Sequence, residues 1–174
     1  KLTDKSFDGM VMPDQATQPR YVVQKSTAAA LDFAAVMATA SRVLAPYDGQ
    51  LKGASARMLA ASKAAWQWAQ RNPAVLYRQP KDIRTGEYGD TDVSDEFAWA
   101  AAELYIATGD DAYYKAMRAP SVQATIPSWS DVRGLAWMSL ARHRKQLSPA
   151  ADQALIAARI DALAGTLAKA WKAS

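Results

Sequence analysis

Residues 26–44 read STAAALDFAAVMATASRVL, a run in which apolar side chains return every three or four positions among small ones. That spacing matches the 3.6-residue turn of an α-helix, so one face of the segment is predicted to be buried. Pro46 and the Asp48-Gly49 pair end the run. The many alanines predict close packing against a neighbouring helix, because small side chains let two helix backbones approach.

The same period returns in five further segments, each bounded by capping or turn residues. Ser94 is the predicted N-cap of a helix that stops at Gly109, and Asp110 is the predicted cap of the short helix that follows. Ser148 and Pro149 are predicted to open the last helix. The predicted helices cover residues 26–44, 54–70, 95–108, 111–117, 131–144 and 149–172.

Helix starts spaced by about 20 to 40 residues are typical of helical hairpins stacked side by side. No sequence motif repeats with them, so the spacing is compatible with an α/α toroid, an α-solenoid or a helical bundle. Residues 1–25 lack a helical period and predict an irregular lead-in with no obvious partner strand. The expected fold class is all-α, with residues 26–174 forming helical hairpins.

Composition excludes several classes of protein. The 21 Lys and Arg against 17 Asp and Glu give a formal charge of +4, but the surplus is scattered, and nucleic-acid binding needs a basic stripe. The basic run at residues 142–145 falls at a predicted helix end, where cations favour the helix dipole. The chain has no cysteine, which excludes disulfides and thiolate sites without fixing a compartment. It has no run of about 18 apolar residues, so no membrane span is predicted.

The densest acidic pattern lies in a long predicted loop, where residues 85–96 read TGEYGDTDVSDE. The carboxylates of Asp90, Asp92, Asp95 and Glu96 would repel one another unless they were solvated or neutralised. A hard cation that takes six to eight oxygen ligands neutralises such a group, and calcium is the natural candidate, although the spacing is not that of an EF-hand. The alternative is a solvated loop whose last two acids stabilise the N-terminus of the next helix.

Two other acids and the histidine are weaker candidates for a functional role. Asp32 and Glu103 lie among apolar helical neighbours, and each is either a buried acid with a raised pKa or a core carboxylate bonded to a neighbouring helix. His143 is the only histidine, so a two-histidine metal site within this chain is excluded and a surface role is expected.

Aromatic residues are the remaining signal, because sugar rings stack their C–H faces on Trp and Tyr. Tyr88 and Trp129 fall in loops just ahead of acidic helix starts, and both are predicted to stack on a carbohydrate. The tryptophans inside predicted helices are expected in the core: Trp66, Trp68, Trp99, Trp137 and Trp171.

Two strings carry a resemblance to a known family. GMVMPDQATQPRYVVQKSTAAALDFAAVMATASRV at 9–43 and TGEYGDTDVSDEFAWAAAELYIATGDDAYY at 85–114 resemble the middle of family 9 glycoside hydrolases, the inverting β-1,4-glucanases. The likeness covers most of residues 1–118 and continues more weakly beyond. It implies an (α/α)6 toroid with a substrate cleft on one face, in which residues 1–174 form a central segment of the catalytic domain.

The resemblance implies no catalytic residue in this chain. The family's base is an aspartate in a DAGD-type motif that lies upstream, and its acid is a glutamate that lies downstream; neither motif is present. The segment by itself is therefore expected to be inactive, with a β-glucan and the remainder of the catalytic domain as partners and with neither nucleic acid nor membrane. The parent enzyme is expected to be secreted or periplasmic.

The resemblance also implies a structural calcium ion at Asp90, Asp92, Asp95 and Glu96, completed by Asp131 from the next helix pair. Arg20 and Tyr21 resemble a segment near the glucan cleft and become substrate-binding candidates. The alternative for Arg20 is a structural pairing with a buried acid such as Asp32. Two alternatives stay open: an exo-acting β-glucosaminidase or cellodextrinase of the same family, and a non-catalytic calcium-binding helical module on the same scaffold.

Overall fold

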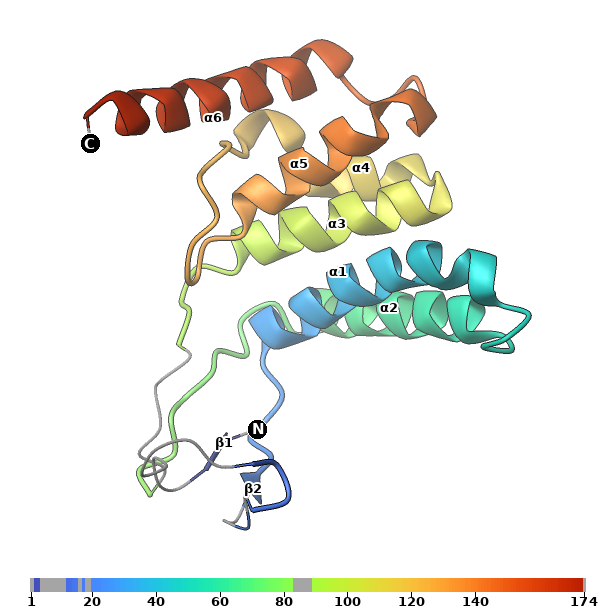
Figure 1. Ribbon diagram of the computed structural model, residues 1–174, viewed down its shortest axis with the longest axis vertical. Coiled ribbons are helices and arrows are strands. Elements are labelled where there is room, and N and C mark those ends of the chain that lie inside the picture. The colour runs from blue at the N-terminus through green and yellow to red at the C-terminus, as the bar shows by residue number, and fades with distance from the viewer. Residues whose placement is uncertain (1, 4–11, 16, 18–19, 83–88, 174) are drawn as a thin grey trace.

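The computed structural model describes residues 2–3, 12–15, 17, 20–82 and 89–173, with only the backbone of residues 2–3 and 20–21. In these parts the chain forms six α-helices, three 3-10 turns and one pair of two-residue strands (Figure 1). The helices are α1 (Thr27–Leu44), α2 (Ala54–Arg71), α3 (Ser94–Thr108), α4 (Asp111–Met117), α5 (Arg133–His143) and α6 (Gln153–Ala173). The turns are η1 (Ala45–Tyr47), η2 (Ala119–Ser121) and η3 (Arg144–Gln146).

The helices form three successive hairpins, α1–α2, α3–α4 and α5–α6, as predicted. The first helix of each hairpin packs on the first helix of the next, so α1, α3 and α5 make an inner layer. These three inner helices run in the same direction, and their N-terminal ends meet at one side of the stack (Figure 1). The all-α class expected from the sequence is confirmed.

The inner layer is packed mainly through alanine. Ala34, Ala35 and Ala38 on α1, and Ala100, Ala101 and Ala102 on α3, have no exposed surface. Such small side chains let helix backbones come close together, as the sequence predicts. Larger fully buried side chains fill the spaces between the layers: Leu31, Leu104, Trp137 and Leu140.

The predicted tryptophan core is confirmed in part. Trp66 and Trp137 are buried, and Trp68 and Trp99 pack against the core with part of their surface exposed. Trp171 is 82% exposed, so its placement in the core was wrong. It lies near the end of α6, where the described residues leave most of the helix surface open to solvent.

Several helix ends follow the predicted capping residues. The Ser26 hydroxyl accepts a hydrogen bond from the Ala29 amide, and the Asp110 carboxylate accepts one from the Ala112 amide at 2.9 Å. Gly109 ends α3 with a φ of 69°, a conformation that glycine adopts without strain. The predicted limits of α1, α3 and α4 are therefore confirmed to within a residue.

Two helices begin later than predicted. Asp131 forms an antiparallel bridge with Ser128, with N···O distances of 3.1 and 3.2 Å, so α5 cannot start before Arg133. The residues after Ser148 form a turn, and the Asp152 carboxylate caps the Leu155 amide at 2.9 Å, which delays α6 to Gln153.

Two smaller corrections concern caps and strands. Ser94 is the first helical residue of α3 and not its cap, and the Asp92 carboxylate accepts the Ser94 amide at 3.0 Å. The lead-in does contain a strand pair, β1 (Leu2–Thr3) with β2 (Arg20–Tyr21), which a two-residue pattern could not reveal.

By length and composition alone, Thr27–Tyr47 is apolar enough to cross a membrane. One such helix is weak evidence, because the core helix of a folded domain passes the same test. Leu31, Ala34 and Ala38 are fully buried, and α1 packs on both α2 and α3. We therefore interpret α1 as a core helix of the folded stack.

Gly134, in the first turn of α5, lies against the loop that precedes it. A Cβ atom added there would be 2.1 Å from the Thr125 carbonyl oxygen and 3.0 Å from Pro127, and a backbone oxygen cannot give way cheaply. We expect Gly134→Ala to lower the free energy of unfolding by about 3 kcal/mol, the upper part of the usual range for overpacking. Urea unfolding of the complete gene product measures this loss.

Gly165→Ala is the matched control. Gly165 is also helical, and apart from the adjoining residues and the backbone of its own helix, no described atom lies within 4 Å of the position that an added Cβ would take. Alanine there is expected to be neutral or to stabilise by up to about 1 kcal/mol. Equal effects at the two glycines would contradict the steric argument.

Candidate functional site

A cavity of about 550 Å³ opens at the N-terminal ends of the inner helices. The start of α1, the segment around Tyr77, the acidic loop before α3 and the loop before α5 all line it. Three acids from different parts of the chain contribute to its wall: Asp32, Asp90 and Glu96. Trp129 lines the same cavity and is 68% exposed, so its ring is open to a ligand.

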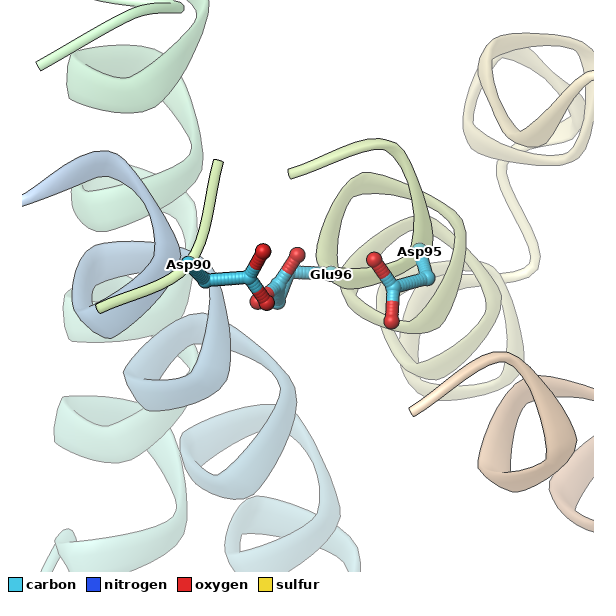
Figure 2. A group of neighbouring side chains, drawn as sticks. All are labelled: Asp90, Asp95 and Glu96. Atoms are coloured by element: carbon cyan, nitrogen blue, oxygen red, sulfur yellow. The ribbon is translucent and has the colours of Figure 1, made fainter. Parts of the chain in front are cut away.

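Three carboxylates at this end of the molecule form a compact cluster. One oxygen each from Asp90, Asp95 and Glu96 lies within 4.8 Å of the others (Figure 2). Asp95 and Glu96 are only 1% and 4% exposed, in the first turn of α3. Calcium binds oxygen at 2.3–2.6 Å, so two ligands of one ion can stand up to about 5 Å apart. The cluster has dimensions that one calcium ion can span.

The cluster leaves buried oxygens without partners. Among the described residues, Asp90 Oδ2, Asp95 Oδ1 and Glu96 Oε2 are buried and accept no hydrogen bond, and Asp32 Oδ1 is in the same condition. An unpaired buried polar atom costs roughly 1–3 kcal/mol, and more when it is charged. A bound cation would remove this cost, so the residues present fit a hard, oxygen-binding metal ion.

Burial and mutual repulsion disturb the titration of two of these acids. Burial, with a contribution from the charge of Asp95, raises the pKa of Glu96 to about 9. Burial also raises the pKa of Asp32 to about 6, with contributions from Asp95 and Asp90. Without a cation the site therefore disfavours full ionisation, which a divalent ion would restore.

Asp92 and Asp131 lie outside this cluster. Asp92 is exposed, and its carboxylate stands 3.7 Å from the Arg133 guanidinium. Asp131 accepts hydrogen bonds from the Thr125 hydroxyl at 2.9 Å and the Arg133 amide at 3.1 Å. The structure thus brings together three of the five predicted metal ligands and joins the other two through Arg133.

The acidic loop before α3 and the loop before α5 nevertheless meet at Asp95. Its Oδ2 atom accepts a hydrogen bond of 2.7 Å from the Val132 amide, which is next to Asp131. This bond fastens the loop before α5 to the first turn of α3. The other oxygen of the same carboxylate, Oδ1, is the one left unpaired.

Of the four predicted substrate-binding side chains, the structure describes only that of Trp129. Trp129 lies in the cavity, where a stacking role requires it. Tyr88 and the side chains of Arg20 and Tyr21 lie outside the described residues. Asp32 belongs to the cavity as well, and its only sequence signal is an acid inside an apolar helical run.

A stack of helical hairpins with an acidic, tryptophan-bearing cavity at the ends of its inner helices is the kind of scaffold on which α/α-toroid glycosidases are built. The chain belongs to glycosyl hydrolase family 9, whose sequence model matches residues 2–172. The fold class predicted from the sequence, helical hairpins forming part of an (α/α)6 toroid, is confirmed with it.

Three comparisons illustrate the relationship. The chain is 45% identical over 154 residues to the xyloglucan-specific endo-β-1,4-glucanase of Bacteroides ovatus, covering 82% of this chain and 26% of that protein. It is 38% identical over 145 residues to endoglucanase C of Cellulomonas fimi, covering 81% of this chain and 12% of that one. The solved structure of a Bacteroides ovatus family 9 protein superimposes with a TM-score of 0.74 at 41% identity, over 85% of this chain and 28% of that one. The chain thus spans between 12% and 28% of the length of these relatives.

Proposed function

We propose that this chain is part of the catalytic domain of an inverting glycoside hydrolase that cleaves β-1,4-glucan bonds. The family match over almost the whole chain carries this proposal. One relative is named as a xyloglucan-specific endo-β-1,4-glucanase and the other as an endoglucanase. The catalytic Asp and Glu belong, on this proposal, to parts of the enzyme outside residues 1–174.

The cavity is the proposed contribution of this chain to the glucan cleft. An exposed indole such as that of Trp129 offers a flat apolar surface for the C–H face of a sugar ring, and the surrounding carboxylates and backbone groups suit its hydroxyls. Tyr88, Arg20 and Tyr21 remain predicted substrate-binding residues.

The proposed cofactor is one structural calcium ion held by Asp90, Asp95 and Glu96. Its support is the 4.8 Å cluster and the unpaired buried oxygens. Three carboxylates supply only part of the six to eight oxygens that calcium takes, so water or backbone oxygens would complete the shell. The ion would hold the acidic loop on the first turn of α3 and so fix the wall of the cavity.

The remainder of the catalytic domain is the proposed protein partner. Phe33, Val36 and Val43 on α1 are each about half exposed, as is Leu167 on α6. Apolar side chains grouped on open helix faces favour contact with further helices. Because β-glucan polymers lie outside cells, we propose that the enzyme is secreted or periplasmic.

Assay of the complete gene product on xyloglucan, carboxymethyl cellulose and cellodextrins tests the function. We expect hydrolysis of at least one β-1,4-glucan with inversion at the anomeric carbon. A rapid fall in viscosity indicates endo action, and release of short sugars without such a fall favours the exo-acting alternative. Calcium binding without hydrolysis of any β-1,4-glucan would favour the non-catalytic module.

Trp129→Ala is expected to raise KM for the hydrolysed glucan about three- to tenfold, because loss of a stacking ring costs about 0.5–1.5 kcal/mol. Its melting temperature is expected to stay unchanged, since the ring is 68% exposed. Tyr47→Ala is the control, because its aromatic ring is 52% exposed in η1, just beyond the C-terminal end of α1 and away from the cavity. Equal KM values for the wild type and Trp129→Ala would exclude the stacking role.

A further inference from the structure

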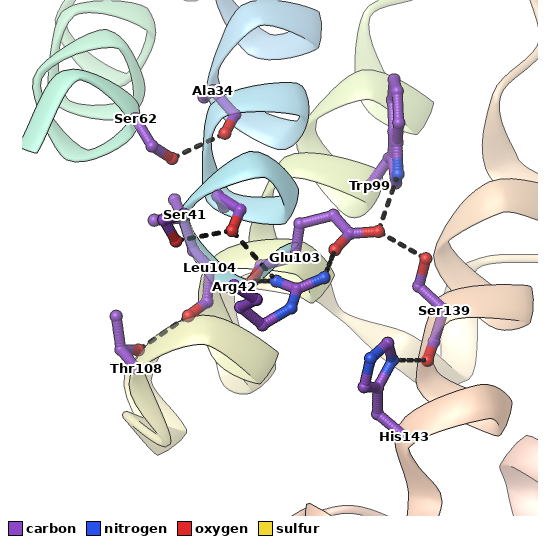
Figure 3. Close-up of polar contacts among 11 residues, drawn as sticks. Ala34, Ser41, Arg42, Ser62, Trp99, Glu103, Leu104, Thr108, Ser139 and His143 are labelled. Carbon is purple, nitrogen blue, oxygen red and sulfur yellow. Dashed lines mark hydrogen bonds and ion pairs between the residues drawn. The ribbon is translucent and has the colours of Figure 1, made fainter. Parts of the chain in front are cut away.

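The carboxylate of Glu103 is buried between the three inner helices, well away from the cavity. Glu103 is 2% exposed on α3, and its Oε2 atom forms an ion pair with the Arg42 guanidinium from α1 (Figure 3). The same guanidinium donates to the Glu103 carbonyl oxygen at 2.9 Å and to the Ala38 carbonyl oxygen at 3.4 Å. Arg42 therefore binds both the backbone carbonyl and the side-chain carboxylate of Glu103.

The other carboxylate oxygen reaches the third inner helix. Glu103 Oε1 accepts hydrogen bonds from the Ser139 hydroxyl on α5 and from the Trp99 indole N–H at 3.3 Å. Ser139 is held in turn by its carbonyl oxygen, 2.9 Å from the Nδ1 atom of His143. This confirms Glu103 as a core carboxylate bonded to neighbouring helices. We name Arg42, Glu103 and Ser139 the inner-helix lock.

Buried ion pairs seldom add net stability over a well-packed apolar group, and their best-established use is to select one register. The packing around this pair needs such a selection. The faces of α1 and α3 that meet are largely alanine, and a surface of nearly identical small side chains matches itself almost equally well after a shift of one helical turn. The lock gives these faces one specific contact.

The register of the inner helices determines the geometry at the cavity. Glu103 follows Glu96 by seven residues on α3, which is two turns, so both lie on one face about 10 Å apart. A slip of α1 past α3 by one turn would move Asp32 by about 5 Å relative to the acid cluster. The same slip of α5 would carry the Val132 amide away from Asp95.

We propose that Arg42, Glu103 and Ser139 are positioning residues that fix the register of α1, α3 and α5 and thereby hold the carboxylates of the cavity at cation-binding distances. The second half of this inference rests on the proposed cation site. None of the three residues lines the cavity, so their effect on binding must pass through the helices.

The test compares Glu103→Gln with the wild type in the complete gene product. Residues 1–174 contain no cysteine. With any cysteine elsewhere in the gene product replaced by serine, spin labels at Gln67→Cys on α2 and Lys115→Cys on α4 report the separation of the first two hairpins. Without metal, we expect Glu103→Gln to broaden this distance distribution or shift it by up to about 5 Å. Terbium(III) luminescence, excited through tryptophan, is expected to show at least tenfold weaker binding.

Ser62→Ala is the matched control. The Ser62 hydroxyl donates a buried hydrogen bond of 2.6 Å to the Ala34 carbonyl oxygen, so its loss weakens a helix contact without touching the lock. We expect its label distances and terbium affinity to match those of the wild type. If Glu103→Gln fails to fold, Arg42→Lys, which keeps the charge on α1 but removes the forked contact with Glu103, is judged by the same two measurements.

Unchanged distances in the lock variants would overturn the register inference, whatever the metal does. Altered distances with wild-type terbium affinity would overturn its link to the cavity. If the wild type binds neither terbium nor calcium, the proposed cation site is excluded. The label distances then still test whether the lock fixes the helix register.

Discussion

Replacing Asp95 with Asn is expected to weaken calcium binding by the complete gene product at least 100-fold and to remove most of its stabilisation by calcium. Asp95 is 1% exposed, its carboxylate belongs to the acid cluster, and its buried Oδ1 atom has no hydrogen-bond partner. Asparagine preserves the shape and an oxygen acceptor for the Val132 amide but removes the charge. A loss of that size corresponds to about 3 kcal/mol. In the wild type, calcium at about 1,000 times Kd should add about 4 kcal/mol to the free energy of unfolding.

Asp92→Asn is the control, because it makes the same charge change in the same loop at an exposed carboxylate outside the cluster. We expect its calcium affinity to stay within about threefold of the wild type. Calorimetric titration and thermal melts with calcium or chelator measure both variants. Equal losses at the two positions would mean that only overall charge matters, and full binding by Asp95→Asn would exclude the proposed ligand set.

The second large effect concerns pH. Without calcium, the free energy of unfolding is expected to fall as pH rises from about 5 to 9, by up to about 1.4 kcal/mol per unit from Glu96 alone. Burial and the charge of Asp95 raise the pKa of Glu96 from 4.5 to about 9. In this window the folded chain holds a proton that the unfolded chain has released, so rising pH favours unfolding.

Calcium should flatten this pH dependence, because the bound ion favours the ionised carboxylate and its binding releases the proton. The gain in melting temperature on adding calcium is therefore expected to be larger at pH 8 than at pH 5.5. Glu96→Gln has no proton to lose, and its chelated form should lack the corresponding slope. A wild type whose chelated form becomes more stable between pH 5 and 9 would contradict the assignment.

The helices could be predicted from the sequence because the signals that define them are local. The apolar period locates α1, and Gly109 supplies the backbone conformation that ends α3. The late starts of α5 and α6 depend on a bridge at Ser128 and a turn after Ser148. Serine, proline and aspartate are also compatible with a first helical turn. Composition alone therefore did not distinguish the bridge and the turn from the start of a helix.

The acidic character of the site could be predicted from the sequence, but the contacts between its residues could not. An acid-rich loop before α3 identifies Asp95 and Glu96 directly, since both lie in one helical turn. Asp32 reaches the same cavity only because α1 packs beside α3, and nothing near it in the chain indicates this. The partners of Asp131 depend on the path of the loop before α5 and on Arg133, which the sequence leaves open.

The parallel direction of α1, α3 and α5 has an electrostatic consequence. Each α-helix carries a macrodipole whose positive pole, roughly half an elementary charge, lies at its N-terminus. The stack points these poles to the same side, toward the cavity and the acid cluster (Figure 1). The backbone itself therefore contributes a positive potential at this end of the molecule, which offsets part of the repulsion among the carboxylates of the cavity.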